Sequence, residues 1–220
     1  MTQQTINLYD GLEALYYMDS TYYDDTADEI KDKSGHGRHA QASGGPTIGV
    51  EGPDSFEATS FDGSDDQFDA GAPIGTTGDE TLFALAKADG LDGAPAITGN
   101  TDGNNGTALF FDVSEDLRYT VAASNSTTAK FGGIQEDTWY ALTGVVDSGN
   151  TRLYVNGSLE ATGSYSGKLA GDDNFLIGNY PRFDSRFNGD IAVVGRWFRA
   201  LSDAEIEYLN RLTAPRRAQL

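Results

Sequence analysis

Residues 137–163 read DTWYALTGVVDSGNTRLYVNGSLEATG, a stretch that encodes three strands and two turns and so decides the fold class. Alternate residues over 139–146 form two sets that are both rich in apolar side chains, which predicts a strand covered on both faces. Asp147–Asn150 supplies the first turn. Asn156 and Gly157 supply the second, because both residue types tolerate the positive φ angles of a two-residue hairpin. A meander of this length must bury a face, so we expect the remaining chain to provide an opposing sheet.

The length and composition fit a single domain. The chain has 220 residues with 27 Gly, 6 Pro and no Cys, and an all-β sandwich often reaches this length as one unit. We therefore predict one domain over residues 1–213, followed by a tail over 214–220. The tail contains Arg216 and Arg217, and we expect it to be flexible or bound to a partner. Packing must hold the core, because no disulfide can form.

The chain carries no sequence signal for a membrane. No run of apolar residues approaches the 18 or so that a membrane-spanning helix needs. The first residues, MTQQTINLYDG, contain neither a basic segment nor an apolar one of the kind found in secretion signals. The sequence therefore predicts no membrane insertion and no secretion signal of its own.

The charge is the most unusual compositional feature. Asp and Glu number 34 against 15 Lys and Arg, which gives a net charge of −19. This is far beyond the magnitude of roughly 2 to 8 that suits a small domain, and such self-repulsion destabilises a compact chain unless salt screens it. In molar salt the Debye length falls to about 3 Å. We predict adaptation to high salt; the alternative, an ordinary acidic surface, is disfavoured by the scarcity of Lys. No basic face can be assembled, so nucleic-acid binding is not expected.

Short strands separated by turns are predicted along most of the chain. Beyond the opening meander, the predicted strands are 12–18, 58–61, 67–69, 80–89, 94–98, 107–113, 117–123, 128–131, 175–178 and 187–198. Residues 19–34 and 44–53 are predicted to be connections. The stretch 80–89 has helical propensity, but its alternation and flanking glycines favour a strand. One helix is predicted over 202–212, since Ser202 and Glu205 form a capping box ahead of apolar residues at helical spacing.

Six segments in order resemble laminin G-like, concanavalin A-like jelly-roll domains. They are ALYYMD (14–19), DKSGHGRHA (32–40), SFDGSDDQFDAG (60–71), TWYALTGVVDSGNTRLYVNGSL (138–159), FLIG (175–178) and FNGDIAVVGRWFRALSDAEI (187–206). The resemblance covers nearly the whole chain from Leu12 to Leu212. It implies an all-β fold in which two antiparallel sheets form a jelly-roll sandwich, with the first and last strands paired and one short C-terminal helix. Fold alone does not give function.

The resemblance also implies a structural calcium ion. It points to Asp32, in the DxSGxG segment, as a ligand, with Asp19 as a further candidate, and oxygen ligands on loops suit Ca²⁺. The family pattern usually places acids after the Ile of the last strand, where this chain has Ala192 and Val193. Asp190 is the nearby substitute. The alternative is that these acids are ordinary solvated surface groups.

Catalysis is not predicted. Jelly-roll glycosidases of this type often present their carboxylates as ExDxxE on one strand, and no such run occurs here. His36 and His39 are expected to be loop residues, and Trp139 and Trp197 core residues. We predict a contact surface where aromatic residues and scarce positive charge gather in one loop, with interstrand packing as the alternative. Its members are Tyr180, Arg182, Phe183 and Arg186.

The sequence therefore favours a non-enzymatic binding or structural module. The leading hypothesis is a virion surface protein, such as a capsid turret, spike or tail component, of a virus that infects a halophile. Its expected partners are other virion proteins or further copies of itself, with Arg216 and Arg217 as docking points, and host glycans. One alternative is a glycan-binding or adhesion module of a secreted, extracellular halophilic protein. A glycoside-processing enzyme with an unrecognised site is the third hypothesis.

Overall fold

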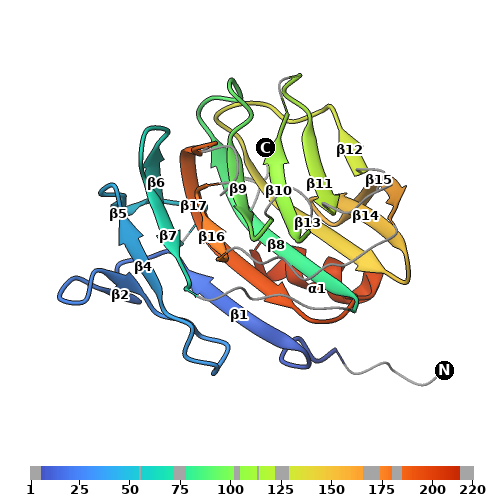
Figure 1. The fold of residues 1–220 in the computed structure, drawn as a ribbon, viewed down its shortest axis with the longest axis horizontal. Helices are drawn as coiled ribbons and strands as arrows, with labels where there is room; N and C mark the ends of the chain where they lie inside the picture. The colour runs from blue at the N-terminus through green and yellow to red at the C-terminus, as the bar shows by residue number, and fades with distance from the viewer. Residues whose placement is uncertain are drawn as a thin grey trace.

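Two antiparallel sheets pack face to face, and a helix lies against the outer face of one of them (Figure 1). The computed structural model describes residues 6–54, 56–71, 78–101, 105–112, 114–121, 129–165, 174–179 and 185–213. The predicted all-β sandwich with a short C-terminal helix is confirmed.

The sheet that carries the helix is called sheet A. Its strands are ordered β15 (Ser158–Ser164), β14 (Asn150–Val155), β13 (Trp139–Asp147), β8 (Glu80–Ala88), β17 (Asn188–Trp197), β6 (Glu57–Asp62) and β5 (Thr47–Glu51). In addition, β1 (Leu12–Tyr17) pairs with the second half of β17, from Leu12 opposite Trp197 to Tyr17 opposite Val193. Figure 1 shows β1 in blue beside β17 in orange-red. The first strand therefore pairs with the last, as predicted.

The opposing sheet is called sheet B. Its strands are ordered β12 (Ala129–Phe131), β11 (Leu117–Val121), β10 (Thr107–Phe111), β9 (Ala96–Gly99), β16 (Leu176–Ile177), β7 (Gln67–Asp69), β4 (Ala40–Ser43), β3 (Glu29–Ile30) and β2 (Tyr23–Asp24). Every strand pair in both sheets is antiparallel among the described residues.

Two segments predicted as connections contain strands. Residues 44–53 hold β5, which pairs with β6 at the end of sheet A, and glycine and proline around it hid its short alternating pattern. Residues 19–34 hold β2 and β3, which form a two-residue ladder at the end of sheet B. Both corrections concern the ends of sheets, where a strand needs only one partner and little apolar surface.

Sheet A is buried on both faces, as residues 139–146 predicted. On β13, Leu142 and Val146 face the core between the sheets, while Ala141 and Val145 face the helix side. The β14–β15 hairpin also follows the sequence: Asn156 and Gly157 have φ angles of 51° and 80°. The two apolar sets therefore serve two different cores.

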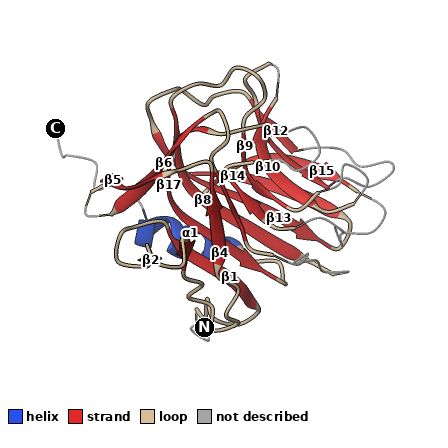
Figure 2. Cartoon of the chain, turned by 60° about the vertical axis from the view of Figure 1, so that its left-hand side comes forward, coloured by secondary structure: helices blue, strands red, loops and turns tan. Residues whose placement is uncertain are grey.

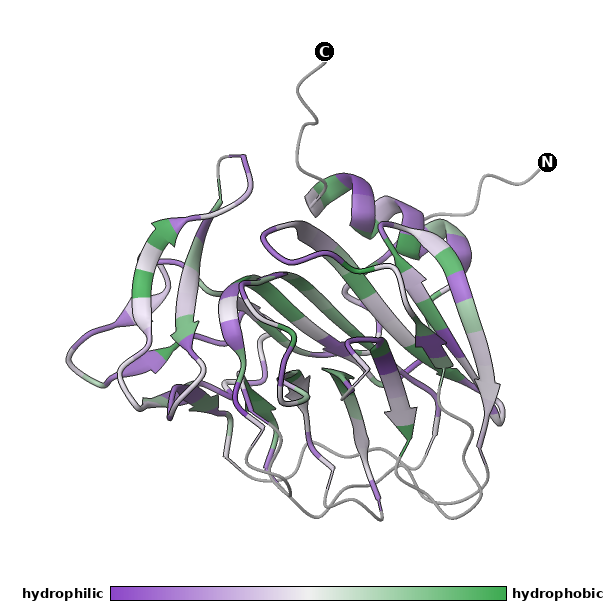
Figure 3. Cartoon of the chain, turned by 90° about the horizontal axis from the view of Figure 1, so that it is seen from above, coloured by the Kyte–Doolittle hydropathy of each residue, from purple (hydrophilic) through white to green (hydrophobic). Residues whose placement is uncertain are grey.

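The helix, α1 (Asp203–Thr213), closes the outer core on sheet A. The predicted capping box is present, because Ser202 N donates to Glu205 Oε2 at 2.9 Å and Glu205 N to Ser202 Oγ at 3.4 Å. Ile206 and Leu209 are buried against the sheet. Figure 2 shows α1 in blue behind the strands, and Figure 3 shows apolar and polar residues interleaved along it. Among the described residues, the structure contains no helix with the length and apolar character that a membrane crossing requires.

Candidate functional site: an aromatic pocket between the first strand and the C-terminal helix

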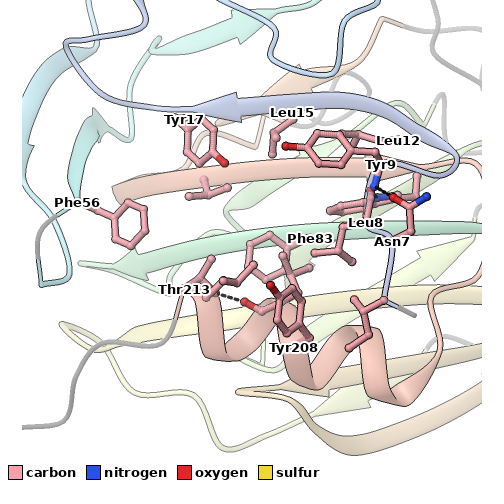
Figure 4. Close-up of a pocket in the computed structure, with 15 residues that line it drawn as sticks. Asn7, Leu8, Tyr9, Leu12, Leu15, Tyr17, Phe56, Phe83, Tyr208 and Thr213 are labelled. Carbon is pink, nitrogen blue, oxygen red and sulfur yellow. Dashed lines mark hydrogen bonds between the residues drawn. The ribbon is translucent and has the colours of Figure 1, made fainter. Parts of the chain in front are cut away.

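A pocket of about 430 Å³ lies on the outer face of sheet A (Figure 4). Its lining comes from four places: β1, the sheet floor, α1 and the segment that precedes β1. Phe56, just before β6, closes one end. The lining residues are Ile6, Asn7, Leu8, Tyr9, Leu12, Leu15, Tyr17, Phe56, Phe83, Val193, Trp197, Tyr208, Leu209, Leu212 and Thr213. We call this the aromatic pocket.

Strand alternation gives the pocket its floor. On β1, Tyr16 packs in the core between the sheets, whereas Leu15 and Tyr17 face outward. Phe83 and Trp197 come from β8 and β17 and are 1% and 2% exposed. The floor is therefore a continuation of the outer core that α1 leaves uncovered.

The segment before β1 is held in place as a wall. Trp197 Nε1 donates to the carbonyl oxygen of Leu8 at 2.6 Å. Arg199 donates to the carbonyl oxygens of Asn7 at 3.0 Å and Asp10 at 2.7 Å. The same guanidinium group binds Glu205 of α1 at 2.7 and 2.9 Å. Arg199 thus ties this segment to the helix on the other side of the pocket.

The rim of the pocket is tyrosine-rich. Tyr9 is 79% exposed and Tyr208 36%, and Leu212 beside them is 52% exposed. Burial raises the pKa of the Tyr17 hydroxyl, and nearby Tyr9, Tyr22 and Asp19 raise it further, so the hydroxyl stays protonated. Within the described part of the chain, the hydroxyls of Tyr9, Tyr17 and Tyr208 form no hydrogen bond to another residue. Hydrogen-bonding groups are therefore available at the mouth of the pocket.

The predicted calcium ligand Asp32 is a hydrogen-bonding hub. Its Oδ1 accepts from the backbone nitrogens of Leu15 at 3.1 Å and Ser34 at 2.9 Å. Its Oδ2 accepts from Ser34 Oγ at 2.7 Å and Arg38 N at 3.1 Å. Burial opposes ionisation of Asp32, but these bonds outweigh it and lower its pKa. N–H and O–H donors, rather than an open oxygen cage, surround this carboxylate.

The other two predicted ligands are held elsewhere. Asp19 accepts from the backbone nitrogens of Thr21 at 2.9 Å and Tyr22 at 3.1 Å. Asp190 pairs with Lys87 at 2.9 Å. Asp19, Asp32 and Asp190 do not form a cluster, so the donors present do not fit one ion held jointly. Calcium binding stays a prediction from the family resemblance.

One acidic cluster does form within the described residues. Asp62, Asp65 and Asp66 have carboxylate oxygens within 4.8 Å of one another, and Asp66 is 5% exposed. Burial raises the pKa of Asp66, and the other two acids raise it further. Asp66 Oδ2 already accepts from Asp62 N at 2.9 Å, so the cluster is tied into its own loop.

Most of the predicted contact surface lies outside the described residues. This applies to Tyr180, Arg182, Phe183, Arg216 and Arg217. Arg186 is described, and it donates to Gln67 Oε1 at 2.8 Å and to the Asp65 carbonyl oxygen at 3.2 Å. It therefore joins the segment before β17 to β7, while its role in partner contact stays a prediction.

Sequence reasoning did not find the aromatic pocket. Trp197 was predicted to be a core residue, and it is buried as expected while also forming pocket floor. The available signal was in LEALYY (12–17), where Leu15 and Tyr17 make the second face partly apolar although β1 needs only one face to cover the core between the sheets. The outer face is completed by segments that lie far apart in the sequence, as the contact between Leu8 and Trp197 shows.

Comparison with known protein families agrees with the observed fold. A family model described as "Concanavalin A-like lectin/glucanases superfamily" matches residues 61–207, more than half of the 220-residue chain. No curated protein matched the sequence.

Several solved structures share the fold at low sequence identity. A mutant sialidase of Trypanosoma rangeli with trans-sialidase activity superposes with a TM-score of 0.66 at 15% identity, covering 94% of this chain and 33% of that one. The receptor binding domain of botulinum neurotoxin D gives a TM-score of 0.66 at 13% identity, covering 93% and 53%. The domain of the C/D mosaic serotype gives 0.67 at 12% identity, covering 93% and 52%. This chain thus spans about a third to a half of these proteins, and the likeness concerns fold alone.

Proposed function

Because this chain belongs to the concanavalin A-like lectin/glucanase superfamily, we propose that it is a non-enzymatic binding module that recognises a glycan. The observation that carries the proposal is the tyrosine rim of the aromatic pocket. Aromatic rings offer apolar faces to the C–H faces of a sugar, and the hydroxyls of Tyr9, Tyr17 and Tyr208 can bond to sugar hydroxyls. A pocket of about 430 Å³ falls within the range for small-ligand sites.

The lining of the pocket supports binding rather than cleavage. Glycosidic hydrolysis generally uses two carboxyl groups on either side of the scissile bond. The described residues that line the pocket include no Asp or Glu. Sialidases share the fold, so hydrolysis is the outcome that a test must address.

A glycan array in molar potassium chloride tests this function. We expect a restricted set of glycans to bind, and Tyr208→Phe and Tyr9→Ala to weaken each hit several-fold by removing a hydroxyl and a ring. Leu159→Ser is the matched control, because Leu159 is 51% exposed on β15 and does not line the pocket. Absence of glycan binding, or binding unchanged in both tyrosine variants, would refute the proposal. Release of free sugar from the hits would identify an enzyme instead.

We also propose the setting predicted from the sequence, a virion surface protein of a virus that infects a halophile. The net charge of −19 supports the high-salt part of this setting. Mass spectrometry of purified virions and of culture supernatant distinguishes it from a secreted adhesion protein, since peptides of this chain should be enriched in the virions. Recovery only within a large secreted polypeptide would favour the secreted module.

A further inference from the structure

We infer that the ligand of the aromatic pocket is a glycoside with an apolar, uncharged aglycone, which fills the pocket while the sugar sits at the rim. This inference rests on the proposed function and specifies the ligand class of the same site. It follows from the different chemistry of the floor and the mouth of the pocket (Figure 4).

The interior of the pocket offers a sugar almost nothing to bond to. Its one indole, Trp197 Nε1, already donates to the Leu8 carbonyl oxygen at 2.6 Å. Thr213 Oγ1 donates to the Leu209 carbonyl oxygen at 2.9 Å. Asn7 is exposed rather than interior, and its Oδ1 accepts from Tyr9 N at 3.1 Å. A sugar placed deep in the pocket would lose its hydrogen bonds to water without replacing them. An aliphatic or aromatic group has no hydrogen bonds to water to lose. When it enters the pocket, it buries its own apolar surface and that of the floor.

The charge of the site selects an uncharged group. None of the described lining residues is Asp, Glu, Lys or Arg. Two guanidinium groups lie beside the site, and both are paired: Arg199 with Glu205 and two carbonyl oxygens, and Arg211, which lies 5.9 Å from the centre of the Tyr208 ring, with Glu207. Among the described lining residues, free polar groups belong to the tyrosine rim and to the exposed amide of Asn7.

The rim marks where the polar and apolar parts of the ligand meet. Tyr9, Tyr208 and Leu212 are three of the four large hydrophobic side chains that are exposed among the described residues. Their gathering around one pocket gives a very acidic chain an apolar surface that no described residue covers. An alkyl chain entering between the segment before β1 and α1 covers these side chains and leaves its sugar within reach of the hydroxyls.

A series of glucosides tests the inference. Binding of methyl, hexyl and octyl β-D-glucopyranoside, each below its micelle concentration, is followed by calorimetry and by tryptophan fluorescence, to which Trp197 in the floor and Trp139 both contribute. Burial of one methylene group corresponds to about fourfold in affinity, so affinity should rise by about that factor per added carbon until the pocket is full. Equal affinity for methyl and octyl glucoside, or no binding of the octyl compound, overturns the inference.

Two further comparisons separate failure of this inference from failure of the proposed function. Octyl tri(ethylene glycol) has the same chain without a sugar, and binding as tight as octyl glucoside would show that the sugar contributes nothing. Glycan binding on the array together with no gain from the octyl chain would leave the proposed function standing alone.

Point variants locate the two parts of the ligand. Leu212→Asn should reduce the gain of octyl over methyl glucoside several-fold, because it places an amide in the apolar wall. Tyr208→Phe should weaken both glucosides by a similar factor, and the matched control Leu159→Asn should change neither. An octyl gain unaffected by Leu212→Asn would place the chain elsewhere and overturn the inference.

Discussion

A buried ion pair is the most consequential pair of side chains in the core between the sheets. Arg196 of β17 and Glu80 of β8 are both 0% exposed, and their Nη2 and Oε2 atoms lie 2.8 Å apart. The hydroxyls of Thr107 and Tyr119 donate to the other oxygen of Glu80. The guanidinium also lies 5.2 Å from the centre of the Phe175 ring. Glu80 thus bonds to Arg196 in its own sheet and to Thr107 and Tyr119 in sheet B, so it links the two sheets.

Removing one charge of this pair should be costly. Glu80→Gln leaves the Arg196 guanidinium buried without a counter-charge, and breaking a buried pair typically costs about 3–5 kcal/mol. We expect a loss of that size in the free energy of unfolding measured with denaturant. Glu207→Gln is the control, because Glu207 pairs with Arg211 while 63% exposed and should change stability by less than about 1 kcal/mol. Equal effects of the two substitutions would contradict this account.

Asp32 permits a test that distinguishes hydrogen bonding from calcium binding. Asp32→Asn replaces one acceptor with an amide donor that faces Ser34 Oγ and the backbone N–H of Arg38, leaving buried groups unpaired at a cost of about 1–3 kcal/mol. We expect the melting temperature to fall equally with calcium and with chelator. If chelation alone lowered the melting temperature of the wild type to that of the variant, the predicted calcium site would be supported instead.

At the level of elements, α1 depends on its first turn. Glu205 caps the helix through Ser202 and binds Arg199, which also holds the segment before β1. The Arg199 guanidinium, followed by hydrogen bonds from Ser202, lowers the pKa of Glu205 from its ordinary 4.5 to about 2, against the opposing effect of burial. One carboxylate thus fixes both the helix and a wall of the aromatic pocket.

The lowered pKa of Glu205 gives a signed pH dependence. A carboxyl group whose pKa is lower in the folded state stabilises fully above its unfolded value, and the contribution disappears as pH falls through the folded value. The melting temperature of Glu205→Gln should therefore lie below that of the wild type near pH 7. The gap should narrow between about pH 5 and pH 2. A gap that stays constant over this range, or appears equally in Glu207→Gln, would argue against the assignment.

Element by element, the sequence predicted strands best where period-2 patterning was strong. The stretch 80–89 was predicted to be a strand despite its helical propensity, and Leu82 and Phe83 do face opposite cores. By contrast, β5 lies between glycines and a proline, and β2 and β3 are only two residues long. Their alternation is too short to be recognised, and their polar composition is typical of loops. The aromatic pocket was missed because it needs knowledge of which strand exteriors the helix leaves bare.

For the whole molecule, charge is the dominant property. A net charge of −19 on 220 residues repels itself in dilute buffer, and many acids are already engaged locally, as Asp32 and Glu205 illustrate. Salt screens the repulsion among the remaining, exposed acids, because buried pairs are little affected by salt. Composition alone predicted this property, since it does not depend on how the chain folds.

Stability should therefore rise with salt into the molar range. Thermal melts from dilute to molar potassium chloride should shift upward by several degrees or more, since screening removes repulsion from the compact state. Sucrose series at matched water activity provide the control for exclusion effects that do not involve charge. A melting temperature that does not change with potassium chloride would contradict the predicted adaptation to high salt.

The pairing of β1 with β17 also determines when this protein can fold. Since β17 lies between β8 on one edge and β6 and β1 on the other, sheet A has a gap at its centre until residues 188–197 have left the ribosome. Contacts of such long sequence separation close slowly, because loop entropy is lost before they form. Folding of sheet A should thus wait for the synthesis of residues 188–197, which leaves the edges of the earlier strands unpaired and open to chaperones until then.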